Sequence, residues 1–162
     1  MMNIKTLLFS LLAVFLLAAC NKGADPIPIN PNQLADDIVR IEAYLDANGL
    51  TAQKTASGLH YIIEEEGIGD EFPEADSDVI IYYKGYLLDG TVFDQQNTDG
   101  DPATFNLQNL IVGWAEGIPL FKKGGKGTLL LPSGLAYGTS GSGTTIAPNT
   151  PIAFDIELVN FN

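Results

Sequence analysis

The 162 residues are enough for one domain of ordinary size with its own hydrophobic core, and the chain shows no internal repeat. Twenty acidic residues against 8 basic ones give a formal net charge of −12, which opposes binding to nucleic acid and to anionic lipid headgroups. A single cysteine rules out a disulfide framework, and a single histidine argues against both a metal site and a His-based nucleophilic triad.

The first twenty residues have the pattern of an export signal. Lys5 precedes an apolar run from Leu7 to Ala19, which is shorter than the ~20 apolar residues of a membrane-spanning helix. The run ends in Leu-Ala-Ala-Cys, a tetrad that resembles the lipobox of bacterial lipoproteins. This resemblance implies a signal peptide over residues 1–19, cleavage before Cys20 and a lipid on that cysteine, which would hold the protein at a membrane. The alternative is an ordinary signal peptide with a cysteine nearby.

A polar, proline-containing segment and one helix are expected next. Residues 20–32 contain three prolines and are typical of an extended tether between the lipid and the domain. Gln33 to Asn48 is predicted to be a helix within an N-terminal unit over residues 33–50, because apolar side chains recur at spacings of four, three and four from Leu34 to Leu45. This apolar face is either a dimer seam or a surface packed on the chain's own domain, and we favour the second interpretation.

After Gly58 the hydrophobic period changes from helical to alternating. Asp89-Gly90 is a strong hairpin-turn signal between two such segments. The sequence predicts one short helix, over residues 109–116, and strands at residues 59–64, 79–88, 91–93, 127–131 and 152–159. Few helices among several short antiparallel strands indicate the α+β class.

Two segments that partly resemble a phosphate loop and a calcium loop lack the residues or the spacing that those sites need. Gly124 to Gly127 lacks the Ser or Thr of a phosphate loop and precedes a strand instead of a helix. The carboxylates between Glu64 and Asp78 lack the alternating spacing of a calcium loop. His60 is expected on the surface of a strand. We therefore expect no cofactor and no metal.

Three motifs between residues 83 and 154 have a specific order and spacing. They are Asp-Gly-Thr-Val-Phe-Asp at residues 89–94, Gly-Trp-Ala-Glu-Gly at residues 113–117, and Leu-Ala-Tyr-Gly at residues 135–138. Together they place aromatic side chains around one carboxylate on a small antiparallel sheet. The pattern predicts a pocket for an apolar peptide segment.

From about Gly58 to its end, the chain resembles the FKBP-type peptidyl-prolyl isomerases. It is most similar to the bacterial lipoprotein and secreted branch, which includes proteins similar to the macrophage infectivity potentiator. The resemblance implies an antiparallel, twisted sheet curled around one short helix, in a domain over residues 55–162. It also implies catalysis of cis–trans isomerisation at Xaa-Pro bonds of polypeptide substrates.

The pocket residues of that family carry over onto matching positions of this chain. The resemblance implies that Tyr137 and the backbone N–H of Ile146 hold substrate carbonyls, with Asp94 at the rim. The implied catalytic residues are Asp94, Tyr137 and Phe93, and the implied substrate-binding residues are Tyr83, Phe105, Leu110, Ile111, Trp114, Ile146 and Phe154.

Three positions depart from the family pattern, namely Ala103, Ser142 and Thr145. We expect these departures to change loop contacts and substrate preference more than the catalytic pocket. The resemblance implies macrolides as candidate inhibitors, and we expect the departures to weaken macrolide binding relative to the eukaryotic members of the family.

The sequence leaves more than one function open. The first hypothesis is an isomerase that assists folding of exported proteins in the bacterial cell envelope. Asn21, and not Asp, follows Cys20, which is compatible with the outer membrane. The second is a chaperone or scaffold that binds proline-containing segments with little catalysis, and the third is a structural lipoprotein. The joint presence of Asp94, Phe93, Trp114 and Tyr137 favours the isomerase, because a scaffold needs no particular carboxylate.

Overall fold

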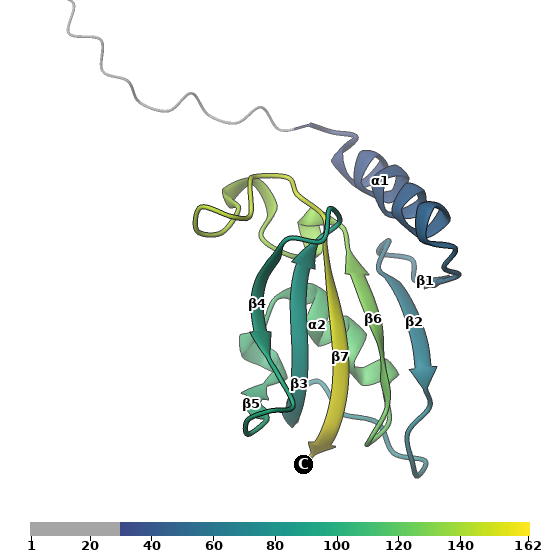
Figure 1. Ribbon diagram of the computed structural model, residues 1–162, viewed down its shortest axis with the longest axis vertical. Helices are drawn as coiled ribbons and strands as arrows, with labels where there is room; N and C mark the ends of the chain where they lie inside the picture. Colours follow the sequence, from purple (N-terminus) through teal and green to yellow (C-terminus); the bar gives the residue numbers. More distant parts are fainter. Residues whose placement is uncertain (1–29) are drawn as a thin grey trace, which may run out of the picture.

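The computed structural model describes residues 30–162, and Figure 1 shows one sheet with a helix across its end and a second helix against its face. The predicted signal peptide, Cys20 and most of the predicted tether lie outside the described residues. The sheet has seven strands within the described residues, and six of them follow the order β1-β2-β6-β7-β3-β4. The seventh, β5, pairs with the first residues of β3, on the edge that β4 occupies further along. All pairings are antiparallel. The α+β class is confirmed.

The elements agree closely with the periodicity of the sequence. The strands are β1 (Gln53–Lys54), β2 (His60–Glu65), β3 (Asp78–Leu87), β4 (Val92–Gln96), β5 (Ala103–Asn106), β6 (Lys126–Leu131) and β7 (Ile152–Phe161), and the α-helices are α1 (Gln33–Asn48) and α2 (Val112–Gly117). Short 3-10 turns cover Leu107–Asn109 (η1), Ile118–Leu120 (η2), Ser133–Leu135 (η3) and Gly138–Ser140 (η4). Strands β1 and β5 were not predicted, because they are too short to show a period.

The helix predicted over residues 109–116 begins three residues later in the structure, and a separate 3-10 turn precedes it. A 3-10 turn ends at Asn109 and α2 begins only at Val112, because Leu110 and Ile111 are extended, with ψ angles of 171° and 148°. This break turns the backbone before α2 starts.

The Asp89-Gly90 turn joins β3 to β4 as expected. Gly90 has a φ of 90°, a conformation that favours glycine, and the Thr91 N–H donates to the Asp89 carboxylate at 2.9 Å. The Leu87 N–H donates to the Thr91 carbonyl at 2.9 Å and closes the hairpin. The turn therefore fixes the register that places Asp94 opposite Gly85.

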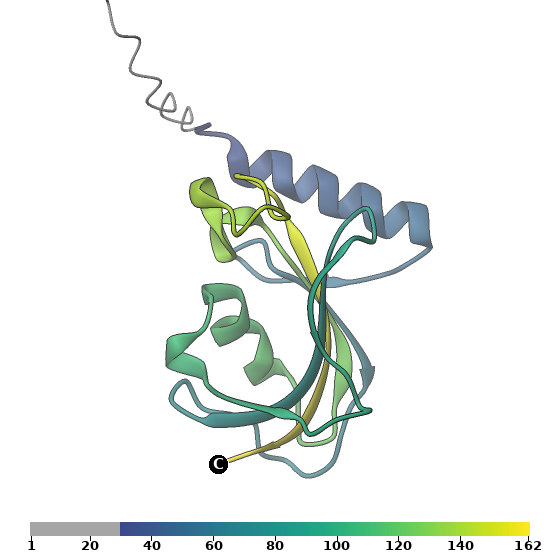
Figure 2. The same ribbon diagram turned by 60° about the vertical axis from the view of Figure 1, so that its left-hand side comes forward.

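The main core lies between the concave face of the sheet and α2 (Figure 2). Leu129 and Leu131 of β6 are fully buried there, and Trp114 of α2 is 4 % exposed. Gly117 permits the close approach of α2, because a Cβ at this position would lie 2.6 Å from the Leu129 Cδ1 atom. A Cβ at Gly113 would likewise meet the side chain of Leu131. Gly113 and Gly117 therefore allow α2 to pack closely against β6.

Helix α1 packs on the opposite face of the sheet, across one end (Figure 2). Ile41 is fully buried and Leu45 is 6 % exposed, and they contact the outward side chains of β3, β6 and β7 in a second apolar cluster with Tyr86, Leu130 and Ala153. Gly49 ends the helix with a φ of 64°. Of the two interpretations of the apolar face, packing on the chain's own domain is confirmed for these residues, while Leu34 stays 47 % exposed.

The sequence predicted that His60 is exposed on the surface of its strand, but the structure buries its side chain. It is 3 % exposed beneath α1, where its Nδ1 lies 2.9 Å from the Gly58 carbonyl oxygen and its Nε2 lies 3.8 Å from Glu42. Burial lowers the pKa of His60 below its ordinary value. The expectation was wrong because α1, which is distant in sequence, covers this outward face of β2.

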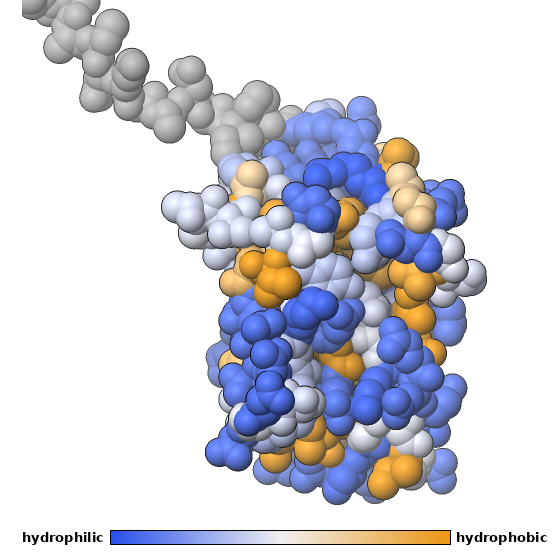
Figure 3. Space-filling view, in the orientation of Figure 1, coloured by the Kyte–Doolittle hydropathy of each residue, from blue (hydrophilic) through white to orange (hydrophobic). Residues whose placement is uncertain are grey.

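The remaining surface is mainly polar. The face in Figure 3 is largely hydrophilic, with apolar residues in small groups, in keeping with the net charge of −12. Across residues 30–162, no helix has both the length and the apolar character needed to span a membrane.

Candidate functional site

A cavity of about 290 Å³ opens on the concave side of the sheet, beside α2. Its walls come from β3, β4, β5, β7, the segment before α2 and the loop between β6 and β7. The lining residues are Tyr83, Asp94, Phe105, Asn109, Leu110, Ile111, Trp114, Tyr137 and Phe154. All the catalytic and substrate-binding residues predicted from the sequence line this cavity, apart from Phe93 and Ile146.

Aromatic rings pack edge to face around Trp114. Its ring centroid lies 5.1 Å from that of Tyr83, 5.0 Å from that of Phe154 and 5.9 Å from that of Phe105, with interplanar angles near 80°. Edge-to-face pairs are the preferred geometry of aromatic rings and hold each ring against its neighbours. Among the described residues the buried Trp114 Nε1 has no hydrogen-bond partner. The result is an apolar floor of rings packed against one another.

Two polar groups stand at the rim of this aromatic floor. The Tyr83 hydroxyl donates to the Asp94 Oδ2 atom at 2.9 Å, and Asp94 itself is exposed. Burial, followed by the hydrogen bond to this carboxylate, raises the pKa of Tyr83 to about 12, so the hydroxyl keeps its proton near neutral pH. Burial and the Asp94 charge also raise the pKa of Tyr137. Within residues 30–162 the Tyr137 hydroxyl has no hydrogen-bond partner, and it lines the cavity.

Gly85 explains why the hairpin brings Phe93 and Asp94 to this place. A Cβ at Gly85 would lie 2.6 Å from the Phe93 Cε2 atom and 2.7 Å from the Phe154 Cε1 atom. The two rings pack over the glycine with centroids 5.6 Å apart. Phe93 therefore contacts the back of Phe154 and does not line the cavity itself.

Ile146 differs from its expected role. Its side chain is 5 % exposed in the core, and its N–H already donates to the Ser142 carbonyl at 3.1 Å across a short bridge. A role as a donor to substrate does not fit this arrangement. Ile111 offers a better donor, because it lines the cavity and, within the part of the chain described, its N–H donates to no protein acceptor.

The sequence did not single out Asn109, which also lines the cavity. It ends the η1 turn, one of several polar residues in that segment, and no local signal distinguishes it from its neighbours. The polar groups that line the cavity belong to Tyr83, Asp94, Asn109 and Tyr137. In residues 30–162, no group of three or more His, Cys, Asp or Glu side chains is arranged to hold a metal ion.

Comparison with known proteins agrees with this geometry. Residues 69–159 match the family model of the FKBP-type peptidyl-prolyl cis-trans isomerases. A probable isomerase FkpA of Neisseria meningitidis is 45 % identical over 120 residues, which cover 73 % of this chain and 44 % of that protein. FkpA of Escherichia coli K12 is 45 % identical over 108 residues, or 66 % of this chain and 39 % of that protein.

Solved structures give the same result. The crystal structure of FkpA from Escherichia coli has a TM-score of 0.69 and 37 % identity, covering 81 % of this chain and 62 % of that one. A peptidyl-prolyl cis-trans isomerase from Pseudomonas syringae has a TM-score of 0.69 and 30 % identity, covering 84 % of this chain and 99 % of that one. The chain spans less than half the length of the two FkpA relatives matched by sequence. On the match of residues 69–159 and the likeness along the whole Pseudomonas syringae chain, this protein belongs to the FKBP-type peptidyl-prolyl cis-trans isomerase family.

Proposed function

We propose that this protein accelerates cis–trans isomerisation of Xaa-Pro bonds in polypeptides. The observation that carries the proposal is the cavity itself, a floor of edge-to-face aromatic rings with an unpartnered tyrosine hydroxyl and one carboxylate at its rim. No nucleophile or metal is required for this reaction, since no bond is broken and only a C–N bond rotates.

The physical reason lies in the electronic structure of the amide. Resonance resists rotation with a barrier of ~18–20 kcal/mol and leaves negative charge on the oxygen and positive character on the nitrogen. Rotation removes this charge separation, so the twisted state is less polar than either planar isomer. An aromatic cavity with little water therefore stabilises the twisted state relative to the planar states, which is the difference in binding that lowers a barrier. A gain of ~10³-fold corresponds to about 4 kcal/mol.

The residues divide into a floor and a rim. Trp114 and Phe154 receive the prolyl ring, with Phe93 supporting Phe154 from behind. Tyr137 donates to a carbonyl of the bound segment. Asp94 accepts from Tyr83, an arrangement that holds both groups in place, and it acts through its charge and not as a proton-transfer base.

Exchange spectroscopy on an Xaa-Pro peptide tests the proposal with the full chain. The uncatalysed exchange takes tens to hundreds of seconds, so acceleration is easy to detect. We expect clear acceleration by the wild type and a loss of about tenfold for Asp94→Asn. Asp99→Asn serves as the matched control, because Asp99 is exposed in the loop after β4 and its side chain lies outside the cavity.

The assay distinguishes the isomerase from the alternative functions. Peptide binding without acceleration would select the chaperone or scaffold hypothesis. The absence of both binding and acceleration would overturn the proposal. Full activity in folded Asp94→Asn and Phe93→Ala variants would show that the reaction does not use this cavity.

Anchoring in the bacterial cell envelope through a lipid on Cys20 is a separate part of the proposal. It is supported by the Leu-Ala-Ala-Cys tetrad and by the absence of any other cysteine in the sequence. Mass spectrometry of the full chain produced in a Gram-negative host tests it. We expect a mature N-terminus at Cys20 with added lipid mass, and Cys20→Ser should lose that lipid; an unmodified thiol in the wild type would contradict the anchor.

A further inference from the structure

The loop between β6 and β7 carries Tyr137 but has little sheet structure of its own. It runs through residues 132–151 and contains only the η3 and η4 turns and one isolated bridge between Ser142 and Ile146. The position of the Tyr137 hydroxyl, which the proposed function needs, is therefore set by contacts outside the sheet.

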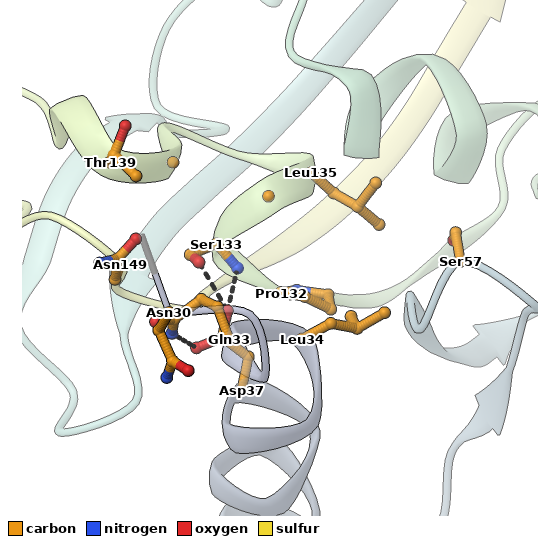
Figure 4. Close-up of a pocket in the computed structure, with 12 residues that line it drawn as sticks. Asn30, Gln33, Leu34, Asp37, Ser57, Pro132, Ser133, Leu135, Thr139 and Asn149 are labelled. Atoms are coloured by element: carbon orange, nitrogen blue, oxygen red, sulfur yellow. Dashed lines mark hydrogen bonds between the residues drawn. The ribbon is translucent and has the colours of Figure 1, made fainter. Parts of the chain in front are cut away.

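Helix α1 supplies the first of these contacts through a buried carboxylate. Asp37 is fully buried, and its Oδ2 atom accepts from the Ser133 N–H at 2.8 Å and from the Ser133 hydroxyl at 2.6 Å (Figure 4). The Oδ1 atom accepts from the Gln33 side chain at 2.8 Å. A buried carboxylate with three donors is a strong and directional connection.

This connection leads directly to Tyr137. Ser133 begins the η3 turn, in which the Leu135 N–H donates to the Pro132 carbonyl at 2.9 Å and the Ala136 N–H donates to the Ser133 carbonyl at 3.0 Å. Tyr137 follows immediately after Ala136. A displacement of Ser133 is therefore transmitted along one hydrogen-bonded turn to the tyrosine.

A second contact from α1 reaches the far end of the same loop. The Arg40 Nη1 atom donates to the Asn149 carbonyl at 3.2 Å, and the Asn149 N–H donates to the Gly138 carbonyl at 2.8 Å. Asn149 has a φ of 56°, the one positive φ among the described non-glycine residues. Gly138 is the neighbour of Tyr137, so α1 contacts the loop on both sides of the tyrosine.

Apolar contacts between α1 and the loop are incomplete beside these hydrogen bonds. A cavity of about 380 Å³ lies between α1 and the loop, lined among others by Leu34, Pro132 and Leu135 (Figure 4). Leu34 is 47 % exposed, so its packing against the loop is incomplete. The hydrogen bonds of Asp37 and Arg40 therefore carry much of the positional restraint.

We infer that α1 is a positioning element for the Tyr137 loop, with Asp37 and Arg40 as its positioning residues. Helix α1 lies outside residues 69–159, which the family model matches, so this restraint is added to the family domain by the N-terminal part of the chain. The inference rests on the proposed function, in which Tyr137 holds a substrate carbonyl.

The test compares Asp37→Asn with the wild type in the full chain. Asp46→Asn is the matched control, since it makes the same chemical change at an exposed position of the same helix. We expect kcat/KM to fall about tenfold in Asp37→Asn, mainly through a higher KM, because a misplaced Tyr137 weakens binding of planar and twisted substrate alike. If Asp37→Asn fails to fold, Ser133→Ala removes one donor and keeps the carboxylate, with an expected fall of about threefold.

A double-mutant cycle separates positioning from general destabilisation. In a Tyr137→Phe background, Asp37→Asn should cause almost no further loss of kcat/KM, because its effect passes through the tyrosine hydroxyl. Losses that multiply independently would overturn the inference.

Amide hydrogen exchange supplies a readout that does not depend on catalysis. In Asp37→Asn the Ala136 and Asn149 amides should exchange at least about tenfold faster, while amides of β7 keep their wild-type rates. A wild type without isomerase activity would refute the proposed function alone, and exchange would then decide the inference. Unchanged exchange at Ala136 and Asn149 would overturn the positioning role.

Discussion

Replacement of Gly85 by alanine sets two physical effects against each other. Alanine is favoured over glycine inside a strand by about 0.5–1 kcal/mol, so the local propensity of β3 predicts a more stable protein. The added Cβ, however, would lie 2.6 Å from the Phe93 ring and 2.7 Å from the Phe154 ring, closer than the 3.4 Å at which ordinary contact begins. Overpacking of this kind costs about 1–3 kcal/mol.

The second effect is expected to win because neither ring has room to move freely. Phe154 is 3 % exposed, and its centroid lies 5.0 Å from that of Trp114, so a shift away from Cβ presses it into the floor of the cavity. We expect Gly85→Ala to lower the free energy of unfolding by about 1–2 kcal/mol. Isomerase activity should fall as well, since the cavity becomes narrower.

Urea unfolding followed by tryptophan fluorescence measures the change in stability and reports on the cavity floor, because Trp114 is the single tryptophan of the chain. The Xaa-Pro peptide exchange assay measures the change in activity. Gly100→Ala is the control, since a Cβ there would meet only the Gln96 side chain, at 3.6 Å. A Gly85→Ala variant that is as stable as the wild type, with unchanged emission and activity, would refute the packing argument.

Three further predictions concern buried groups. Burial lowers the pKa of His60 below 6.5, so its contribution to stability is present above pH 6.5 and is lost as the pH falls through the folded-state pKa. His60→Gln should therefore weaken the dependence of the urea-unfolding free energy on pH below 6.5, and an unchanged dependence would contradict this. The Tyr86 hydroxyl donates to Asp155 at 2.8 Å, so Tyr86→Phe should cost about 1 kcal/mol at pH 7. Since burial raises the pKa of Tyr86 above 10.0, its contribution is present below pH 10 and is lost at higher pH, and the variant should lack this part of the alkaline decline. Phe154→Leu should raise KM severalfold in the peptide assay, because it removes two edge-to-face contacts from the floor, and an unaltered KM would argue against that floor.

Local patterns predicted most of the secondary structure. The spacing of apolar residues from Leu34 to Leu45 predicted the helix α1 and its apolar face, and the Asp89-Gly90 signal predicted the hairpin of β3 and β4. These predictions succeed because helical and strand periods, and the φ preference of glycine, depend on near neighbours in the chain. The short strand β5 shows the limit, since it is defined by its pairing with β3.

The set of residues around the cavity was also largely available from the sequence. Tyr83, Trp114 and Phe154 belong to different elements, and the order and spacing of the motifs identified them through a resemblance to a known family. Their mutual distances were not available. Nor was the state of the Ile146 N–H, which a bridge to Ser142 engages.

The sequence by itself determined most of the longer elements, because these depend on short-range periods. It also gave most residues of the aromatic site, through the resemblance that the order and spacing of the motifs carry. Only the tertiary structure decided that His60 and Asp37 are buried, and that Asp37 contacts Ser133 across the domain. The physical reason is that burial and long-range hydrogen bonds are properties of two surfaces in contact. Helix α1 covers the outward face of the sheet and the start of the Tyr137 loop, and no local pattern in either partner specifies the other.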